Sequence, residues 1–416
     1  MTVRILLWHG YLLGGTGSNV YTRALAREWS RAGHDVVVVC QERAPDQYDL
    51  GGARVTTVDL PGRLLPVFVM DRYAGLEPRL LQDFSAAERA AYVEANAGAL
   101  RELLPADVVF ANHVLMGGAV GAATGVPFRV KAHGSELEYS MRGRPELERL
   151  GADALAQAEA AYVGSAHIRE VLEEVVGHVH HVYEVPPGVD VDEFTLRPRD
   201  EALAGLLEEA RRDPPNPGNA EERLPDEGNA ERLARFLAGD APTVVYFGKL
   251  IEQKGVQVLL EAMHGVDARL VVVGFGPYRA TLEGLAPERT LFTGPFEHRH
   301  LVHLLPLADV TVVPSIFPEA FGMVAAEAAA AGSPPLVARH SGLAEVAAGL
   351  EAEYPPRLRH LASFETANAA DLRAKLQELL ELSREDHDAL REAARRAVVE
   401  RWSWGGVARR LLQDPG

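Results

Sequence analysis

The chain has 416 residues, 47% of them hydrophobic, and a formal net charge of −17. A chain of this length usually divides into two domains, and its composition is that of a globular protein rather than a disordered or fibrous one. The acidic balance argues against a general attraction to nucleic acid or anionic lipid, so local groups have to hold any bound phosphate.

The single cysteine and the N-terminal residues bear on the location of the protein. Cys40 has no partner for an intramolecular disulfide, which suits a reducing compartment. The first residues enter a strand-like run at once, without a signal-peptide pattern, and no stretch of about 18 apolar residues occurs. We therefore expect a cytoplasmic protein without a strong membrane signal.

Short β-rich runs alternate with helical stretches from the N-terminus onward, as in "RILLW", "DVVVVC" and "DVVFAN". The same alternation restarts at residues 243–248 and continues through "LVVVG", "DVTVVPS" and "SPPLVAR". This alternation is typical of βαβ units, so we expect two doubly wound α/β domains. Ligands of such sheets bind at the carboxyl ends of the strands, so functional residues are expected there.

The turn "GGTGSN" at residues 14–19 follows the first strand and opens a helix. Gly15 and Gly17 permit close approach of a ligand, and the start of the helix favours a phosphate or a sugar hydroxyl. The third glycine of a dinucleotide-binding fingerprint is missing. Glu42, beyond the second strand, could nevertheless take the place of the acidic residue that binds ribose in an NAD-binding fold. A tight turn without a ligand is the alternative.

His133 stands at the carboxyl end of a later strand in "RVKAHGSELE". This position predicts that it faces the cleft of the second domain, although a lone histidine is more often structural.

Residues 213–236, which we call the insertion, contain "GNAEERL" and, ten residues later, "GNAERL". Their proline, glycine and acidic content predicts a solvated loop or short surface helices, to which we assign no chemistry.

Two lysines, Lys249 and Lys254, flank a glycine turn after the first strand of the second domain. In so acidic a chain they suggest a clamp for a diphosphate, with solvated surface lysines as the alternative. Gly274 and Gly276 end the next strand in a turn that admits a flat base or a ribose.

The stretch "PEAFGMVAAEAAAAG" at residues 318–332 holds two glutamates eight positions apart. We predict a helix from near Phe321 or Gly322, with Glu319 before it and Glu327 within it. Eight helical residues turn through about 800°, so one ligand can span both carboxylates. Glu327 suits a ribose diol and Glu319 a sugar ring, although a dipole-stabilised acid and a solvated acid would also fit the pattern. The predicted anion site consists of the backbone N–H groups of Ala320, Phe321, Gly322, Met323 and Val324.

Together these motifs resemble the retaining GT-B glycosyltransferases of family 4, nearly from end to end. The E-x7-E pattern carries the resemblance, with "PPGVDVDEF", "GKLIEQKG", "AHGSE" and "RWSW" in the family's order. It implies two Rossmann-like parallel-sheet domains that face a cleft. We expect an acceptor domain at 1–187, a donor domain at 188–394 with an acidic inserted region at about 200–240 around the insertion, and a helical segment at 395–416 that packs back on the first domain.

The resemblance implies transfer of a hexose from a nucleotide diphosphate sugar to an acceptor hydroxyl, with retention and without a bound metal or cofactor. Lys249 and Lys254 would hold the diphosphate and Glu327 the ribose. Glu319 with the helix-start amides would hold the sugar, which His133 would contact near the reacting centre. Three residues are the catalytic candidates: His133, Glu319 and Lys254. Lys249 replaces the family's usual arginine, which reduces a bidentate phosphate contact to a point charge.

The donor is expected to be UDP-glucose, with GDP-mannose as the alternative. The acceptor can be a small molecule, a glycan or a lipid, and the oligomeric state stays open. An NAD-dependent oxidoreductase would leave Glu327 and Lys254 without a purpose. A GT-B sugar-nucleotide epimerase would share the nucleotide site but need no acceptor, and a catalytically silent sugar-binding relative is a third alternative.

Overall fold

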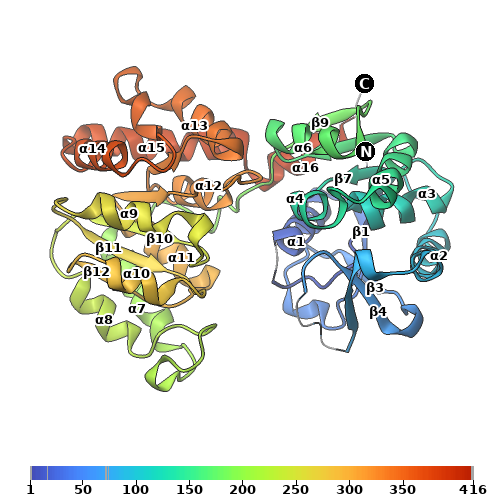
Figure 1. The fold of residues 1–416 in the computed structure, drawn as a ribbon, viewed down its shortest axis with the longest axis horizontal. Helices are drawn as coiled ribbons and strands as arrows, with labels where there is room; N and C mark the ends of the chain where they lie inside the picture. The colour runs from blue at the N-terminus through green and yellow to red at the C-terminus, as the bar shows by residue number, and fades with distance from the viewer. Residues whose placement is uncertain (1, 16, 71–72, 74, 414–416) are drawn as a thin grey trace. The chain divides into compact units, whose positions relative to one another are not determined.

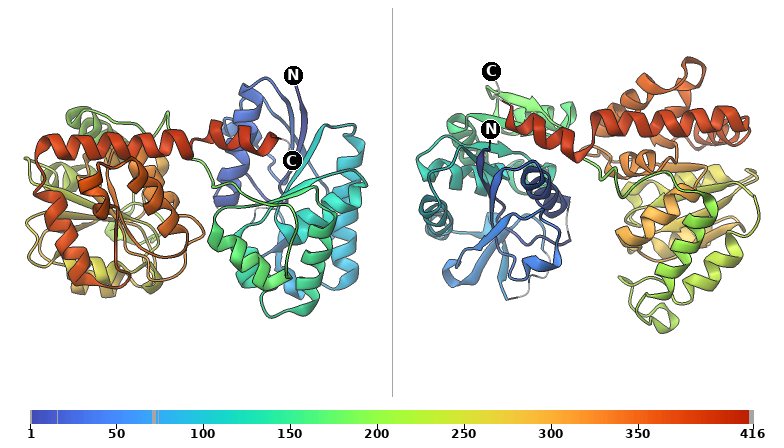
Figure 2. Two further views of the ribbon diagram at one scale, coloured as in Figure 1. Left: turned by 90° about the horizontal axis from the view of Figure 1, so that it is seen from above. Right: turned by 180° about the vertical axis from the view of Figure 1, so that it is seen from behind.

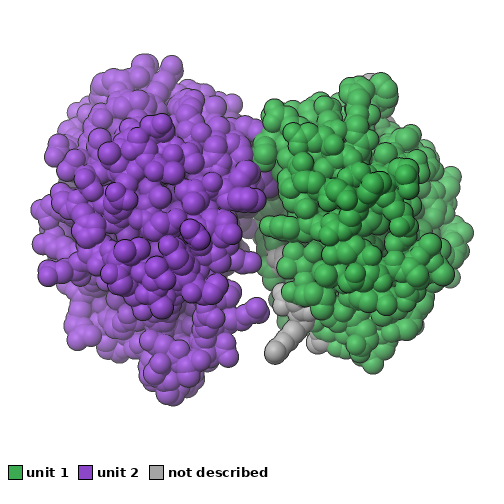
Figure 3. Space-filling model, viewed as in Figure 1, with its two compact units in different colours: residues 1–188, 404–416 green, residues 189–403 purple. Residues whose placement is uncertain are grey.

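The computed structural model describes residues 2–15, 17–70, 73 and 75–413. The chain divides into two compact units, one of residues 1–188 with 404–416 and one of residues 189–403 (Figure 3). Both are α/β units with helices on both faces of a parallel sheet (Figures 1 and 2). The expected doubly wound fold class is confirmed.

The first unit is built on a seven-stranded sheet in the order β3-β2-β1-β6-β7-β8-β9, and every pair in it is parallel. Helices cover both faces, which explains why its strands are continuous apolar runs rather than alternating ones. The strands are β1 (Arg4–Trp8), β2 (Asp35–Cys40), β3 (Arg54–Thr57), β6 (Val108–Asn112), β7 (Arg129–Lys131), β8 (Ala160–Val163) and β9 (Val182–Glu184). A separate parallel pair consists of β4 (Leu64–Val67) and β5 (Glu77–Leu80).

The helices of this unit form two layers, each with its own apolar core. One layer consists of α1 (Gly17–Arg31) and α16 (Trp404–Leu412). The other side carries α2 (Ala86–Glu102), α3 (Ala119–Thr124), α5 (Pro145–Gln157) and α6 (Ala166–Val176). Short helical segments complete the unit: η1 (Pro45–Gln47), η2 (Pro61–Arg63), η3 (Leu81–Asp83), the π-helical η4 (Val114–Gly118), α4 (Gly134–Glu136) and the π-helical η5 (Leu137–Met141).

The C-terminal helix α16 packs on the first unit. Trp29 Nε1 donates a hydrogen bond to the carbonyl of Ala408 at 2.9 Å, and the ring of Trp404 lies edge-on to Tyr21 with centroids 5.5 Å apart. Residues 395–401, which we expected in the same segment, instead continue helix α15 (Arg384–Arg401) of the second unit. The change of unit therefore comes at Trp404.

The second unit is built on a six-stranded parallel sheet in the order β12-β11-β10-β13-β14-β15. Its strands are β10 (Thr243–Phe247), β11 (Arg269–Val273), β12 (Thr290–Phe292), β13 (Val310–Val313), β14 (Pro335–Ala338) and β15 (Ser363–Phe364). Its other helices are α7 (Arg199–Arg211), α8 (Asn229–Phe236), α9 (Val256–Met263), α10 (Arg279–Leu285), α11 (His298–Leu304), α12 (Met323–Ala330), α13 (Ser341–Glu353) and α14 (Ala369–Leu380). Short 3₁₀ segments are η6 (Pro217–Asn219), η7 (Glu252–Lys254), η8 (Leu305–Leu307) and η9 (Pro356–Ala362).

Helix α12 lies within the core of the second unit, against β13, β14 and α15. Five of its eight residues are fully buried alanines. Side chains this small let a helix approach its neighbours closely, so the alanine run fixes α12 and with it the loop that leads into the helix. Across the residues that the structure describes, no helix combines the length and apolar character needed to cross a bilayer.

The insertion is more ordered than its composition predicts. It contains η6 and α8, and its outer turn at residues 217–223 is exposed, as expected. The expected short helices are therefore present, but Asn216, Asp226 and Asn229 are only 2–4% exposed, so the segment is anchored more deeply than a surface loop. Hydrogen bonds to main-chain groups, which composition does not reveal, account for this burial.

Replacing Trp404 by alanine should destabilise the first unit by about 3–5 kcal/mol, because the variant loses a large buried ring that covers α1. Urea unfolding should show the transition of the first unit at lower denaturant. Val399→Ala, at an exposed position of α15, is the control and should change stability by less than about 0.5 kcal/mol. Equal midpoints for the two variants would contradict the packing of α16.

Candidate active site

The strand order of the second sheet reverses between β10 and β13, so the loops that follow these strands diverge. Open α/β sheets bind ligands at such a reversal. The two loops are tied together by the amide of Ile316, which donates to the carbonyl of Gln253 at 3.0 Å. Gly255 has φ +68°, and a Cβ atom there would lie 1.9 Å from the carbonyl oxygen of Pro314. Only glycine permits this close approach of the loops.

Lys254 and Glu319 meet at this reversal. The ammonium of Lys254 donates to Oε1 of Glu319, and both side chains keep part of their surface in solvent, 33% and 21% respectively. The backbone of Glu319 is fixed by Ser341, whose hydroxyl accepts from the Glu319 amide at 2.9 Å. The structure thus brings together two of the three catalytic candidates. Lys249 is exposed, and its carbonyl accepts a hydrogen bond from the Tyr246 hydroxyl at 2.9 Å.

The helix after Glu319 starts at Met323, one or two residues later than expected, because Gly322 adopts a left-handed conformation at φ +117°. Phe321 is buried and lies edge-on to Trp402 at 5.4 Å, so this residue can offer a ligand its backbone but not its side chain. The first turn of a helix leaves N–H groups without intrahelical partners. The five predicted backbone donors all lie at or just before this turn: Ala320, Phe321, Gly322, Met323 and Val324.

Glu327 lies one turn further along α12 and is partly buried among the alanines. Burial raises the pKa of its carboxyl to about 7, and the charge of the nearby His298 lowers this pKa in part. Nε2 of His298 lies 2.7 Å from Glu193. Sequence analysis did not single out His298. Its position in the first turn of α11, after β12 in the same sheet, was the available signal.

The glycine turn after β11 lies beside the lysine loop. The amide of Leu250, next to Lys249, donates to the carbonyl of Phe275 at 2.8 Å, between Gly274 and Gly276. The amide of Gly274 in turn donates to the carbonyl of Gly294 at 2.9 Å. The loops after β10, β11 and β12 therefore form one main-chain-bonded rim.

In the first unit, His133 caps the short helix α4 at the carboxyl end of β7. Its Nε2 lies 3.0 Å from Oδ1 of Asn112, and its amide donates to Glu136 at 3.1 Å. Burial, together with the charge of Lys131, holds the pKa of the His133 imidazole well below its usual value. The ring is therefore neutral at pH 7; its one N–H, on Nε2, donates to Oδ1 of Asn112, and Nδ1 is its acceptor nitrogen.

His113, which sequence analysis missed, lies beside His133 with ring centroids 4.6 Å apart. It follows β6 directly, has φ +72° and is 3% exposed. Within the described chain, neither of its ring nitrogens has a hydrogen-bond partner, and Tyr11 and Phe68 pack against the ring. The carboxylate nearest to its Nδ1, that of Glu136, is 3.8 Å away. A strained backbone and buried nitrogens without hydrogen bonds are unusual outside functional sites. The same rule that selected His133, a histidine at a strand's carboxyl end, would have found it.

The glycine turn of the first unit has the expected location. Gly15 has φ +97° and Gly17 begins α1, whereas Thr16 between them lies outside the described residues. Glu42 is 7% exposed and accepts hydrogen bonds from the amides of Leu13 and Ala44 at 3.3 and 3.0 Å. Because the chain's own amides occupy this carboxylate, it does not fit a ribose-binding role in an NAD site.

Two family models match the chain. Residues 16–188 match the glycosyl transferase 4-like domain, and residues 230–397 match the glycosyl transferases group 1. The chain therefore belongs to the group 1 glycosyltransferases. The two matched ranges lie in the two structural units.

One curated relative of this group 1 glycosyltransferase is the D-inositol 3-phosphate glycosyltransferase of Xylanimonas cellulosilytica. It is 34% identical over 217 residues, which are 49% of this chain and 46% of the relative. The GDP-mannose-dependent alpha-(1-6)-phosphatidylinositol monomannoside mannosyltransferase of Mycobacterium tuberculosis is 27% identical over 299 residues, 67% of this chain and 66% of the relative. The matches thus span between about half and two thirds of these relatives.

Solved structures show that the fold is GT-B. Sucrose-phosphate synthase from Thermosynechococcus elongatus has a TM-score of 0.68 at 20% identity, with 98% of this chain and 96% of that chain covered. Anabaena HepE in complex with UDP and glucose has a TM-score of 0.68 at 15% identity, with 98% of both chains covered.

Because burial raises the pKa of Glu327, we predict that Glu327→Gln stabilises the fold but weakens nucleotide binding. Between pH 4.5 and about 7 the folded protein keeps a proton that the unfolded chain releases, so wild-type stability falls as the pH rises through this window. The variant should therefore gain on the order of 1 kcal/mol relative to wild type at pH 8 and nothing at pH 4. It should also bind a nucleoside diphosphate more weakly, by about 1.5–3 kcal/mol.

Urea unfolding at the two pH values and calorimetry measure these two effects. Glu400→Gln, at an exposed position of α15, is the matched control. Identical pH profiles for Glu327→Gln and wild type would show that this carboxyl does not titrate as described.

Proposed function

We propose that this protein is a retaining glycosyltransferase that moves a hexose from a nucleotide diphosphate sugar to an acceptor hydroxyl. The observation that carries the proposal is the contact of Lys254 with Glu319 at the strand reversal, beside the first turn of α12. This arrangement offers a cation, a hydroxyl-binding carboxylate and a set of N–H donors within one short stretch of surface.

The leaving group is the nucleoside diphosphate, so catalysis requires positive charge where the phosphate oxygens gain negative charge. Lys254 and Lys249 supply this charge together with the first-turn N–H groups of α12. Glu319 accepts hydrogen bonds from hydroxyls of the sugar, and Glu327 accepts them from the ribose. In the free protein the Lys254–Glu319 pair keeps both side chains in place until the donor binds.

The transfer step breaks the bond between the anomeric carbon and the phosphate oxygen and forms a bond from that carbon to the acceptor oxygen. For retention, the acceptor attacks from the side on which the diphosphate leaves, and its proton passes to a departing phosphate oxygen. The neutral His133 then acts as a hydrogen-bonding contact for the sugar in an oxocarbenium-like transition state. This route needs neither a separate protein base nor a bound cofactor.

For the donor, the sequence relatives support GDP-mannose more than the expected UDP-glucose. The mannosyltransferase of M. tuberculosis and a related one of Corynebacterium glutamicum are named as GDP-mannose-dependent. The names of the relatives also support an acceptor that carries a cyclic polyol or a sugar, either free or on a lipid. The buried, unpaired Cys40 supports a cytoplasmic site of action.

Incubation of the protein with GDP-mannose and with UDP-glucose, followed by assay of free nucleoside diphosphate, tests the proposed function. We expect slow donor hydrolysis alone, and faster release when an inositol or mannoside acceptor is added. Formation of an isomeric nucleotide sugar without an acceptor would favour an epimerase. If the protein neither binds nor turns over any nucleotide diphosphate sugar, the proposal is refuted.

Turnover should be independent of divalent metal, because lysines and helix N–H groups supply the positive charge at the diphosphate. Treatment with EDTA, with a metal-free buffer as the control, should change the rate by less than about two-fold. Abolished activity that returns with Mg²⁺ or Mn²⁺ would show that a cation has the role assigned to Lys254.

His133→Ala should leave nucleotide binding unchanged, because the proposed nucleotide-binding residues belong to the second unit. Its kcat should fall by up to about 10²–10³-fold, the loss that follows removal of one hydrogen bond to a transition state. Calorimetry with GDP or UDP and steady-state kinetics on the same variant measure both effects. Lost nucleotide affinity with unchanged kcat at saturating donor would place His133 outside the reaction.

A further inference from the structure

The centre of the insertion is a buried ion pair between Asp226 and Arg279. The side chain of Asp226 is 2% exposed and accepts two parallel hydrogen bonds from the Arg279 guanidinium, at 2.7 and 2.6 Å. Such fork-shaped pairs are directional as well as strong. Arg279 is the first residue of α10, three positions after Gly276, and its amide donates to the carbonyl of Gly276 at 3.0 Å. The ion pair therefore fixes the end of the glycine turn after β11.

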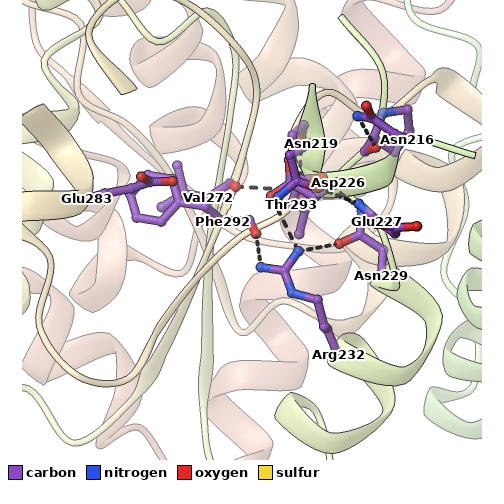
Figure 4. A network of polar contacts seen from close by, with 12 residues as sticks. Asn216, Asn219, Asp226, Glu227, Asn229, Arg232, Val272, Glu283, Phe292 and Thr293 are labelled. Atoms are coloured by element: carbon purple, nitrogen blue, oxygen red, sulfur yellow. Dashed lines mark hydrogen bonds and ion pairs between the residues drawn. The ribbon is translucent and has the colours of Figure 1, made fainter. Parts of the chain in front are cut away.

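The insertion also holds the loop that follows β12, as Figure 4 shows around Thr293. The carbonyl of Thr293 accepts hydrogen bonds at 2.8 Å from the Asp226 amide and from the side chain of Asn229. Arg232 donates to the carbonyl of Phe292 at 2.6 Å. Gly294 has φ +70°, and a Cβ atom there would lie 2.8 Å from Oδ1 of Asp226. The fit between the two segments thus depends on a glycine.

The two copies of the repeated sequence have different roles. In the first copy, Asn219 accepts a hydrogen bond from the amide of Glu227 at 2.7 Å and so supports the turn that carries Asp226. In the second copy, the equivalent Asn229 reaches out to the loop after β12. Asn216 closes the first copy with a hydrogen bond to the carbonyl of Pro225 at 3.0 Å. The duplication therefore supplies both a support and a contact.

These contacts lead to the rim of the candidate active site. Gly294 accepts from the Gly274 amide, and Phe275 accepts from the amide of Leu250, beside Lys249. From the insertion, the guanidinium of Arg223 also lies over the ring of Phe275, 5.8 Å from its centroid. The turn at Gly274 and Gly276 is thus held from one side by the lysine loop and from the other by the insertion.

We infer that Asp226 is a positioning residue for nucleotide recognition. Through Arg279 and Gly294 it holds the turn at Gly274 and Gly276 in the conformation that receives the base or ribose of a nucleoside diphosphate. The inference rests on the proposed function, in which the lysines contact the diphosphate, and on the expectation from the sequence that this turn receives the base or the ribose. Loss of the ion pair should therefore weaken binding of the nucleoside and leave binding of the diphosphate intact.

The test compares a variant that removes the buried carboxylate with one that removes both charges. Asp226→Asn leaves Arg279 with the half-exposed Glu283 as its remaining carboxylate partner, which should lower both stability and affinity. The double variant Asp226→Ala with Arg279→Leu removes both charges of this pair, and Arg232, which also contacts Asp226 at 3.3 Å, is 30% exposed and keeps its hydrogen bonds to Asn229 and Phe292, so stability should recover in large part. Glu283→Gln is the matched control, since it removes the other, half-exposed carboxylate that contacts Arg279 at 2.8 Å.

The probes are UDP, GDP and inorganic pyrophosphate, measured by calorimetry beside thermal unfolding. We expect the double variant to unfold near the wild-type temperature and to bind the preferred nucleoside diphosphate about 10-fold more weakly. Its affinity for pyrophosphate should equal that of the wild type, and Glu283→Gln should match the wild type throughout.

Recovery of nucleotide affinity together with stability in the double variant would overturn the inference and leave the ion pair a purely structural role. Equal loss of nucleotide and pyrophosphate binding would overturn it as well. If the wild-type protein binds neither UDP nor GDP, the proposed function is refuted and the inference with it.

Discussion

The candidate active site depends on the close approach of two loops that are far apart in the sequence. Lys254 and Glu319 are separated by 65 positions, yet their side chains are in contact. Their contact requires Gly255, because a side chain there would overlap the carbonyl of Pro314. It also requires the parallel pairing of β10 with β13, which places the carboxyl ends of both strands at one edge. The charge pair is thus a consequence of sheet topology and one glycine.

Several ionisable groups near the candidate site residues are held away from their ordinary pKa values. Burial raises the pKa of Glu136 and of Glu327 to about 7, and it lowers the pKa of Lys131 to about 7. Burial without a fully compensating partner costs stability, and such groups concentrate at functional sites. Glu136 is the clearest structural case, because it accepts hydrogen bonds from three main-chain amides around His113 and His133. These hydrogen bonds fix the main chain beside both histidines.

The sequence was informative where function depends on spacing along one element. The eight-residue interval between Glu319 and Glu327, the strand-end position of His133 and the glycine turns all follow from local patterns. The structure places Glu319 just before α12 and Glu327 within it, and it places His133 and the glycine turns after strands. The helix start was predicted one or two residues early because the left-handed conformation of Gly322 delays it. Local preference alone does not reveal such a cap.

Features that depend on long-range contacts could not be predicted. Asp226 is an ordinary acidic residue in an acidic segment until Arg279, 53 positions away, is seen beside it. His298 and Glu327 are likewise on different helices, and only the fold brings their charges close. The end of the second unit was misplaced for a related reason, since α15 and α16 read as one helical tail in sequence. Their contacts, rather than their composition, separate them.

The most direct test of the account is the nucleotide affinity of Lys254→Ala, measured by calorimetry with a nucleoside diphosphate and with the corresponding monophosphate. Lys375→Ala is the matched control, since this lysine lies on α14 and donates to the carbonyl of His360 at 2.6 Å. If Lys254 binds the diphosphate, its loss should weaken diphosphate binding about 10–100-fold and monophosphate binding much less. Equal diphosphate affinity in wild type, Lys254→Ala and Lys375→Ala would contradict the central claim.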